Sequence, residues 1–220
     1  AKLFLVAFWE DGMESNAEEI FLNYQNYTQL DRQQQSADGK EDPASELNEF
    51  WFHKFLEQNA ATMTVMEARS ALREADLTFD KKVSLIEYLL WKHKRSAEQF
   101  VKGCGGTETD TDADISNMSP ELKKAMAALD AVKSEIRRID NRTNELSKAS
   151  NAGGIKGITA KQELAAHLAA DPTELNRALV TAEAAVRRAG GSGESVHPAI
   201  LWFMNRELEE MKKYKPQSQQ

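Results

Sequence analysis

Residues 76–87, DLTFDKKVSLIE, constrain the fold more than any other stretch of this chain, because they space oxygen-bearing side chains as a cation-binding loop does. With Asp76 at position 1, Thr78 is at position 3, Asp80 at position 5, Ser84 at position 9 and Glu87 at position 12, and each has a side-chain oxygen. Position 7, Lys82, needs to supply only its backbone carbonyl. Ca²⁺ takes six to eight oxygen ligands, and an EF-hand loop closes with a bidentate Glu at position 12. The spacing therefore predicts an EF-hand, a helix–loop–helix with Ca²⁺ as its cofactor.

The loop departs from the usual calcium-binding pattern at two positions. Position 6 is normally Gly because the backbone has a positive φ there, and this chain has Lys81. A residue with a Cβ in that left-handed conformation costs about 1–2 kcal/mol, which corresponds to about tenfold in affinity. Thr78 at position 3 is a neutral ligand, and Lys81 and Lys82 oppose the charge of the three carboxylates. The residues leave open whether the loop binds Ca²⁺ or keeps the helix–loop–helix shape without metal.

The sequences on both sides of the loop support two flanking helices. Thr64 and Glu67 have the spacing of a capping box, which predicts the start of the entering helix. Apolar residues in 85–91 form one face of an exiting helix. Val83 is at position 8, where paired EF-hands form a short β-bridge. We therefore expect an EF-hand over about 64–95.

A second, degenerate hand is expected over about 16–59, because EF-hands usually occur in pairs. Residues 31–42 are polar and predict a loop, followed by a helix whose apolar face has Leu47, Phe50, Trp51, Phe55 and Leu56. The most favourable calcium frame, 38–49, puts Lys40 at position 3, Pro43 at position 6 and Ser45 at position 8. These residues are unsuitable for metal, so the partner hand is predicted to be metal-free.

The composition changes sharply at residues 103–118, which we interpret as a linker between an EF-hand-like domain (1–102) and a helical domain (119–220). A second acidic pattern occurs here, formed by Asp110, Asp112, Asp114 and Glu121. Ile115 at position 6 and Pro120 at position 11 argue against a calcium loop. The lone cysteine, Cys104, indicates a reducing compartment.

The clearest helix in the chain begins at Ser119-Pro120 and keeps a heptad register for more than three repeats. Position a is occupied by Leu122, Leu129, Ile136 and Thr143, and position d by Ala125, Val132, Ile139 and Leu146. Further helices are expected over 159–170, from Asp171-Pro172 onward, and from Pro198 onward. The predicted fold class is therefore all-α, with a C-terminal helical hairpin or bundle beside the EF-hand-like domain.

The charge is divided unequally within a net charge of −7. Residues 1–118 have 12 basic and 22 acidic side chains, whereas residues 119–220 have 16 basic and 13 acidic ones. The second half can therefore face an acidic partner, and nucleic acid is disfavoured because acidic residues interrupt the basic ones. No apolar run is long enough for a membrane span. The scattered histidines and the lack of catalytic motifs predict a protein that is not an enzyme.

Four stretches then carry a family resemblance: DLTFDKKVSLIEYLLWKHK (76–94), GIKGITAKQELAAHL (154–168), LVTAEAAVRRA (179–189) and AILWFMNRELEEMKKY (199–214). The sequence resembles the calcium-regulated actin-bundling proteins of amoebae. The likeness extends more loosely over residues 1–70, and the family's N-terminal segment is expected to be absent from this chain.

The resemblance implies an EF-hand domain, a helical domain with the strongest filament contact, crosslinking of F-actin in the cytoplasmic cytoskeleton, and a reduction of bundling by Ca²⁺. It carries the ligand roles directly to Asp76, Asp80, Ser84 and Glu87. Thr78 and Lys81 depart from the Asn and Gly of the family. That departure affects the expected calcium regulation more than the expected actin binding.

A basic surface on the helical domain is the expected filament contact. Its members are Lys133, Arg137, Arg138, Arg142, Lys148, Lys156, Lys161, Arg187 and Arg188, with Lys212 and Lys213 in the basic C-terminal tail as a second candidate. Each of these residues can equally be an ordinary solvated charge on a helix. Two other functions stay open, a calcium-sensor adaptor that holds a target helix in its groove and a passive coiled-coil scaffold. The chain is expected to be a monomer or a weak dimer.

Overall fold

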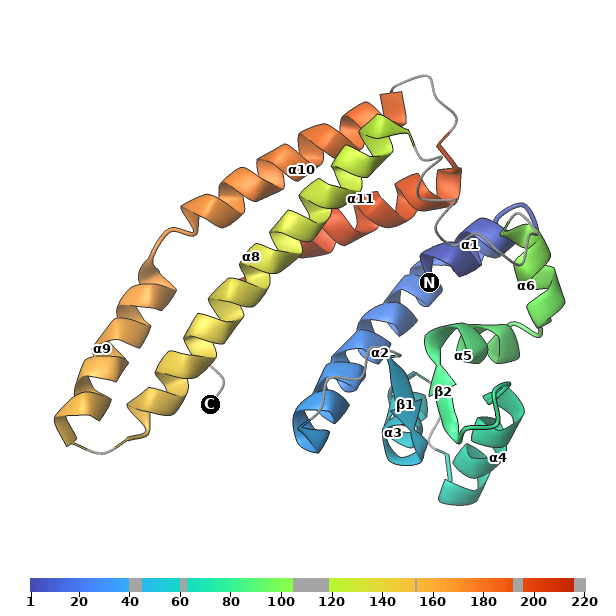
Figure 1. The fold of residues 1–220 in the computed structure, drawn as a ribbon, viewed down its shortest axis with the longest axis horizontal. Helices are drawn as coiled ribbons and strands as arrows, with labels where there is room; N and C mark the ends of the chain where they lie inside the picture. The colour runs from blue at the N-terminus through green and yellow to red at the C-terminus, as the bar shows by residue number, and fades with distance from the viewer. Residues whose placement is uncertain (40–44, 60–62, 105–118, 153, 192–195, 216–220) are drawn as a thin grey trace. The chain divides into compact units, whose positions relative to one another are not determined.

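The structure is a computed structural model that describes residues 1–39, 45–59, 63–104, 119–152, 154–191 and 196–215. The chain divides into two compact units, Ala1–Asp110 and Thr111–Gln220. The described residues are mostly helical, which confirms the predicted predominance of α-helix (Figure 1). Within these residues, no helix is long and apolar enough to cross a membrane.

The N-terminal unit contains a short two-stranded sheet among helices. Its elements in chain order are α1 (Lys2–Phe8), η1 (Met13–Asn16), α2 (Ala17–Asp38), β1 (Glu46–Asn48), α3 (Glu49–Asn59), α4 (Val65–Ala75), β2 (Lys82–Ser84), α5 (Leu85–Lys92) and α6 (Ala97–Gly103). Aromatic rings form much of its core, with Phe55 packed edge-on against Tyr27 and Tyr88 at centroid distances of 5.5 and 4.8 Å. This core joins α2, α3 and α5.

The two strands lie side by side and form one small sheet. β1 and β2 are antiparallel, and Val83 lies opposite Leu47. The strand pairing expected at Val83 is therefore present. However, Leu47 and not Ser45 is its partner, so the frame that we predicted for the partner loop is wrong by two residues. In the corrected frame, positions 1 and 12 are Lys40 and Trp51, and neither is an acidic ligand.

Two other predictions for this region are wrong. Helix α2 continues to Asp38, although residues 31–42 were expected to form a loop. The reason is that polar side chains in the last turns of α2 bind the backbone of β1, as described below. In α3, Phe52 is buried in the core and Phe50 is exposed. The side chain of Asn48 caps this helix by accepting hydrogen bonds from the Phe50 and Trp51 amides, which sets the rotation of the helix.

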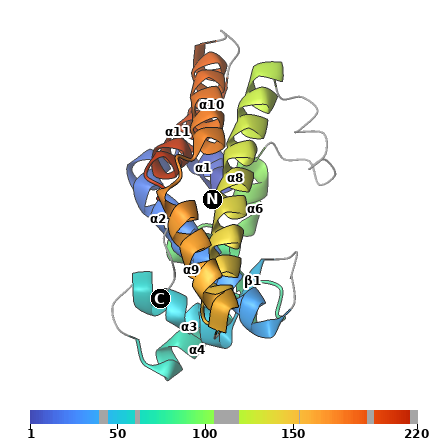
Figure 2. The same ribbon diagram turned by 90° about the vertical axis from the view of Figure 1, so that its left-hand side faces the viewer.

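The C-terminal unit is built around one long helix. Its elements are α8 (Pro120–Ser150), α9 (Gly154–Ala169), α10 (Thr173–Gly191) and α11 (Pro198–Lys212). Helices α9 and α10 both pack along α8, and α11 packs against α10 and α8, as Figures 1 and 2 show. The predicted heptad positions of α8 are buried except for Ile136, which is half-buried. The predicted helical hairpin with a third helix beside it is therefore observed.

Helix α9 begins earlier than the predicted residue 159. A side-chain Cβ at Gly157 would lie only 1.8 Å from the carbonyl oxygen of Ala152, so Gly157 allows the first turn of α9 to pack against the preceding turn. Gly154, with a φ of 77°, begins the helix in a conformation that Gly adopts without strain. Residues 154–157 therefore form the first turn of α9.

Candidate functional site

The candidate metal loop lies between two capped helices, because its local sequence satisfies their free backbone amides. Thr64 and Glu67 form the predicted capping box of α4, and Ser84 and Glu87 form another at the start of α5. Asp76 is the C-cap residue, directly after the last residue of α4. The first and last candidate ligands are therefore held by the ends of the entering and exiting helices.

The carboxylate of Asp76 organises the first half of the loop. It accepts hydrogen bonds from the Phe79 amide at 2.7 Å, the Lys81 amide at 2.8 Å and the Thr78 hydroxyl at 3.2 Å. Asp80 accepts a bond from the Lys82 amide at 2.8 Å. Asp76 is only 7% exposed, so these donors replace much of the water that the carboxylate loses.

The carboxylate of Glu87 joins the two ends of the loop. One oxygen accepts a hydrogen bond from the Leu77 amide at 3.0 Å, and the other accepts one from the Ser84 amide at 2.8 Å. Glu87 is also 7% exposed. The same side chain therefore closes the loop and caps α5, and any ligand that takes its oxygens changes both.

Two residues of the loop have a left-handed backbone conformation. Lys81 has a φ of 68°, which confirms the positive φ predicted for position 6. Phe79 has a φ of 61° and is 85% exposed, a feature that the sequence analysis missed. A bulky residue with positive φ is uncommon and strained. The sequence feature that could have indicated this conformation is the position of Phe79, two residues before Lys81 in the same tight loop.

The oxygen atoms that this loop offers are of the kind that Ca²⁺ prefers, and the backbone has the positive φ expected at position 6. Asp76 and Glu87 are buried carboxylates without an ion-pair partner among the described residues, and Lys82 lies 3.9 Å from Glu46 on the opposite strand. Their oxygens bind loop amides, and in the described part of the chain no three acidic, His or Cys side chains gather closely enough to hold a metal. Binding would require these oxygens to exchange the amides for the ion. The other acidic pattern, at 110–121, lies mostly outside the described residues.

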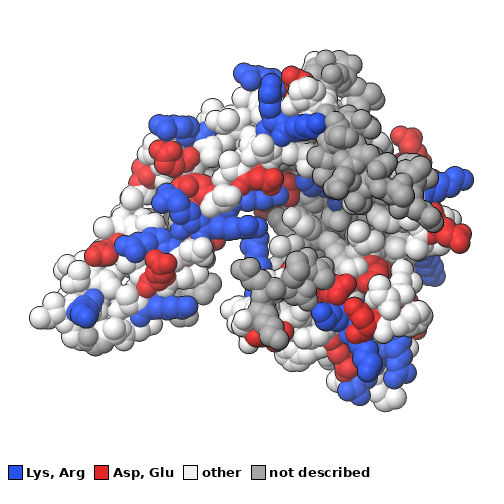
Figure 3. Space-filling model, in the orientation of Figure 1, with Lys and Arg blue, Asp and Glu red and all other residues white. Residues whose placement is uncertain are grey.

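The predicted basic surface separates into paired and unpaired cations. The paired residues and their nearest acidic partners are Lys133–Glu207 (3.0 Å), Arg138–Glu135 (2.6 Å), Arg142–Glu145 and Arg142–Glu163 (both 3.5 Å), Arg187–Glu183 (3.3 Å), Lys212–Glu183 (2.9 Å) and Lys213–Glu210 (2.8 Å). Hydrogen bonds from Arg138, Lys212 and Lys213 lower the pKa of their carboxylate partners. Figure 3 shows basic and acidic side chains interleaved along this unit.

Five members of the predicted surface remain exposed and have no ion-pair partner among the described residues: Arg137, Lys148, Lys156, Lys161 and Arg188. Lys148 and Lys156 lie on either side of the turn between α8 and α9. Ile155 and Ile158 nearby are 83% and 61% exposed. This hairpin end, defined by Lys148, Ile155, Lys156 and Ile158, combines apolar surface with positive charge that has no ion-pair partner within the described residues.

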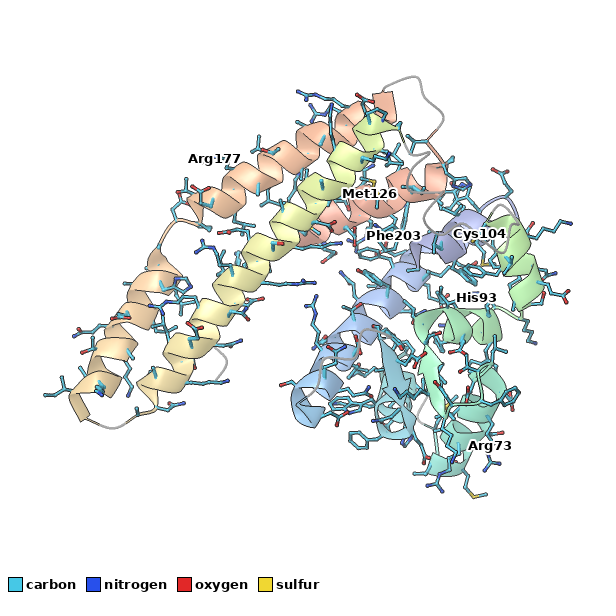
Figure 4. The ribbon with its side chains drawn as sticks, viewed as in Figure 1. Arg73, His93, Cys104, Met126, Arg177 and Phe203 are labelled. Atoms are coloured by element: carbon cyan, nitrogen blue, oxygen red, sulfur yellow. The ribbon has the colours of Figure 1, made fainter. Side chains whose placement is uncertain are left out.

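Figure 4 labels two side chains with different surroundings, Arg177 in the C-terminal unit and His93 in the N-terminal unit. Arg177 projects from the outer side of α10 and pairs with Glu174 on its own helix, at 3.4 Å. His93 lies between α5 and α1, with its ring 5.5 Å from that of Phe4. Burial lowers the pKa of His93, because the charged imidazolium loses water there. The end of α5 is thus coupled to the packing of α1.

Residues 82–195 match the family described as F actin bundling C terminal. The chain belongs to this family. The matched region begins at strand β2 and ends beyond α10, so it includes Ser84, Glu87 and all members of the predicted basic surface except Lys212 and Lys213. The resemblance expected from the sequence is confirmed, and membership of this family agrees with the expectation of a non-enzymatic protein.

A sequence match and a structural match, both from Dictyostelium discoideum, extend the comparison over the rest of the chain. The chain is 36% identical over 172 residues to a calcium-regulated actin-bundling protein, a match that covers 70% of this chain and 56% of that protein. The crystal structure of a 34 kDa F-actin bundling protein superposes with a TM-score of 0.73 at 26% identity, covering 100% of this chain and 92% of that one. The bundling family therefore accounts for both compact units.

Proposed function

We propose that this protein binds actin filaments and crosslinks them into bundles in the cytoskeleton. The observation that carries the proposal is the match of residues 82–195 to the actin-bundling family. The names of the Dictyostelium relatives supply the activity, and the chain spans 56% of the length of the curated relative. Bundling requires two filament contacts, which a monomer with two surfaces or a weak dimer provides.

The hairpin end is the first filament contact that we propose. Lys148 and Lys156 are exposed and have no ion-pair partner in the part of the chain that the structure describes, so an acidic filament surface would attract them without first breaking such a pair. Arg138 offers less, because its guanidinium already makes bonds of 2.6 and 2.9 Å to Glu135. Ile155 supplies apolar area at the same end. The second contact is proposed for the basic tail at Lys212 and Lys213, or for a second copy of the chain.

Regulation is proposed to run through the Asp76–Glu87 loop. Asp76, Thr78, Asp80, the carbonyl of Lys82, Ser84 and Glu87 would hold the ion. Ca²⁺ would supply a positive charge that competes with the loop amides for the carboxylate oxygens. Glu87 would then exchange its bonds to the Leu77 and Ser84 amides for the ion, which alters the cap of α5. The adjoining helices α4 and α5 are joined by a 3.1 Å bond from the Trp91 indole to Glu74, so Trp91 reports on their arrangement.

Paired sedimentation with F-actin, at high and low speed, in Ca²⁺ and in chelator, tests the proposal. High-speed pelleting measures binding, and low-speed pelleting measures bundling. Low-speed pelleting that falls in Ca²⁺ supports the whole proposal. Bundling that ignores Ca²⁺ removes the regulatory part and leaves a working crosslinker. No pelleting at either speed contradicts the function and favours the calcium-sensor adaptor, which a Trp91 fluorescence change in Ca²⁺ would then support.

A further inference from the structure

A single tyrosine hydroxyl from α2 joins the two strands at the centre of the N-terminal unit. Tyr27 is 2% exposed, and its ring packs edge-on against Phe55. Its oxygen accepts a hydrogen bond from the Leu47 amide at 3.2 Å and lies 2.7 Å from the carbonyl oxygen of Val83. Leu47 and Val83 are opposite each other in the β1–β2 ladder, so one hydroxyl contacts both strands at their middle pair.

The protonation state of Tyr27 allows it to act as a donor and an acceptor together. Burial raises the pKa of its phenol, so the hydroxyl keeps its proton at neutral pH. A hydroxyl has one proton, which goes to the carbonyl of Val83 at 2.7 Å or to that of Ser45 at 3.0 Å. The shorter distance favours Val83, which belongs to the candidate calcium loop.

Two other polar side chains of α2, Gln34 and Asp31, bind residues on the β1 side of the strand pair. The amide of Gln34 donates to the Glu46 carbonyl at 2.7 Å and accepts from the Asn48 amide at 3.0 Å. The Ser45 hydroxyl donates to Asp31 at 2.7 Å. Side chains of α2 thus make hydrogen bonds to β1 and to the residue before it. The corrected calcium frame that includes β1 has no acidic residue at position 1 or 12. Tyr27 differs from Gln34 and Asp31 because it also reaches β2.

We propose that Tyr27 is a positioning residue for the Asp76–Glu87 loop, and this inference rests on the calcium part of the proposed function. Val83 directly precedes Ser84, and Glu87 follows in the first turn of α5. By fixing Val83, the Tyr27 hydroxyl holds the second half of the loop in place before an ion arrives. Ordering a loop in advance lowers the cost of binding. The α2 helix therefore takes over the supporting role that a metal in the partner loop would have.

The test compares Tyr27→Phe with Tyr214→Phe in the full chain. Tyr214→Phe is the matched control, because it removes a 2.6 Å hydroxyl bond to Asp140 in the other unit. In chelator, Tyr27→Phe should raise the hydrogen-exchange rates of the β1 and β2 amides by about two- to tenfold, the range expected for one hydrogen bond. Calorimetric titration with Ca²⁺ should give a similar fold loss of affinity, with no change in Tyr214→Phe.

The outcomes separate this inference from the function on which it rests. Wild-type affinity in Tyr27→Phe overturns the positioning role, even if amide exchange increases. A wild-type chain that does not bind Ca²⁺ overturns the calcium part of the proposed function and the positioning role with it. If Tyr27→Phe does not fold, the wild type still decides by NMR: the Tyr27 hydroxyl proton should be protected from exchange and should shift on adding Ca²⁺. A proton that exchanges at once contradicts the inference.

Discussion

Replacing Lys81 by Gly should stabilise the N-terminal unit, because it removes a strained residue from the loop. Lys81 has a φ of 68°, where a side-chain Cβ is unfavourable. Relief of this strain is worth about 1–2 kcal/mol, and the greater freedom of Gly in the unfolded chain offsets about 0.4–1 kcal/mol of it. The midpoints of the two ranges leave a net gain of about 0.8 kcal/mol, which corresponds to a rise of about 3–6 °C in the Tm of a unit of this size.

Thermal unfolding in chelator, followed by the tryptophans of the unit, measures the effect. Lys81→Ala is the first control, since it removes the same charge but keeps the Cβ. Lys82→Gly is the second, since Lys82 lies in strand β2, where Gly destabilises by about 0.5–1 kcal/mol. Lys81→Gly should be more stable than both, and its Ca²⁺ affinity should exceed that of Lys81→Ala. Equal stability of Lys81→Gly and Lys81→Ala would refute the strain argument.

Three further predictions concern the filament contact, the calcium switch and pH. Lys148→Glu with Lys156→Glu should weaken high-speed cosedimentation with F-actin by about tenfold at low salt, because both lysines are exposed and lack an ion-pair partner among the residues that the structure describes. Glu87→Gln should still bundle filaments but lose the response to Ca²⁺, since an amide supplies one acceptor oxygen to the loop where the carboxylate supplies two. Burial lowers the pKa of His93, so below pH about 6.5 the unfolded chain binds more protons than the folded chain. The free energy of unfolding should therefore fall as the pH decreases through that range, and it should fall less in His93→Gln.

Each of these predictions has its own control and contradicting result. Charge reversal at Arg138, which is paired with Glu135, should weaken filament binding less than reversal at the hairpin end. An equal or larger loss at Arg138 would move the contact back along α8. Glu87→Gln that responds to Ca²⁺ like the wild type would show that the switch does not use this loop. For His93, urea unfolding between pH 5 and 8 decides, and parallel curves for both proteins contradict the assignment.

Much of the fold was predictable because its signals are local. Thr64 and Ser84 each lie three residues before a Glu, which is enough to form the two capping boxes. The heptad of α8 predicted its buried face because each turn of a helix repeats the same pattern. The bridge at Val83 followed from its place in the loop. The capping boxes and the heptad depend on neighbours within a few residues.

The predictions that were wrong involve partners far apart in the sequence. Gln34 is polar and suggested a loop, but it is helical and binds β1, whose residues follow more than ten positions later. The frame of the partner loop was wrong because only the pairing with β2 fixes it, and that pairing selects Leu47 over Ser45. The same limit applies to the basic surface. Sequence identified the cations, whereas the ion pair that holds Arg142 to Glu163 crosses from α8 to α9.

The length of α8 has a mechanical consequence for a crosslinker. Its first half lies beside α10 and α11, whereas its last turns lie beside α9, whose buried residues are Gly157 and Ala160 (Figure 1). A force applied where α8 meets α9 is transmitted to the part formed by α8, α10 and α11 along this pair of helices. The buried residues of α9 in the pair are small. We therefore expect this pair to be the most compliant segment of the unit, so tension between two filaments should separate α9 from α8 before it disturbs the core around Leu129 and Met204.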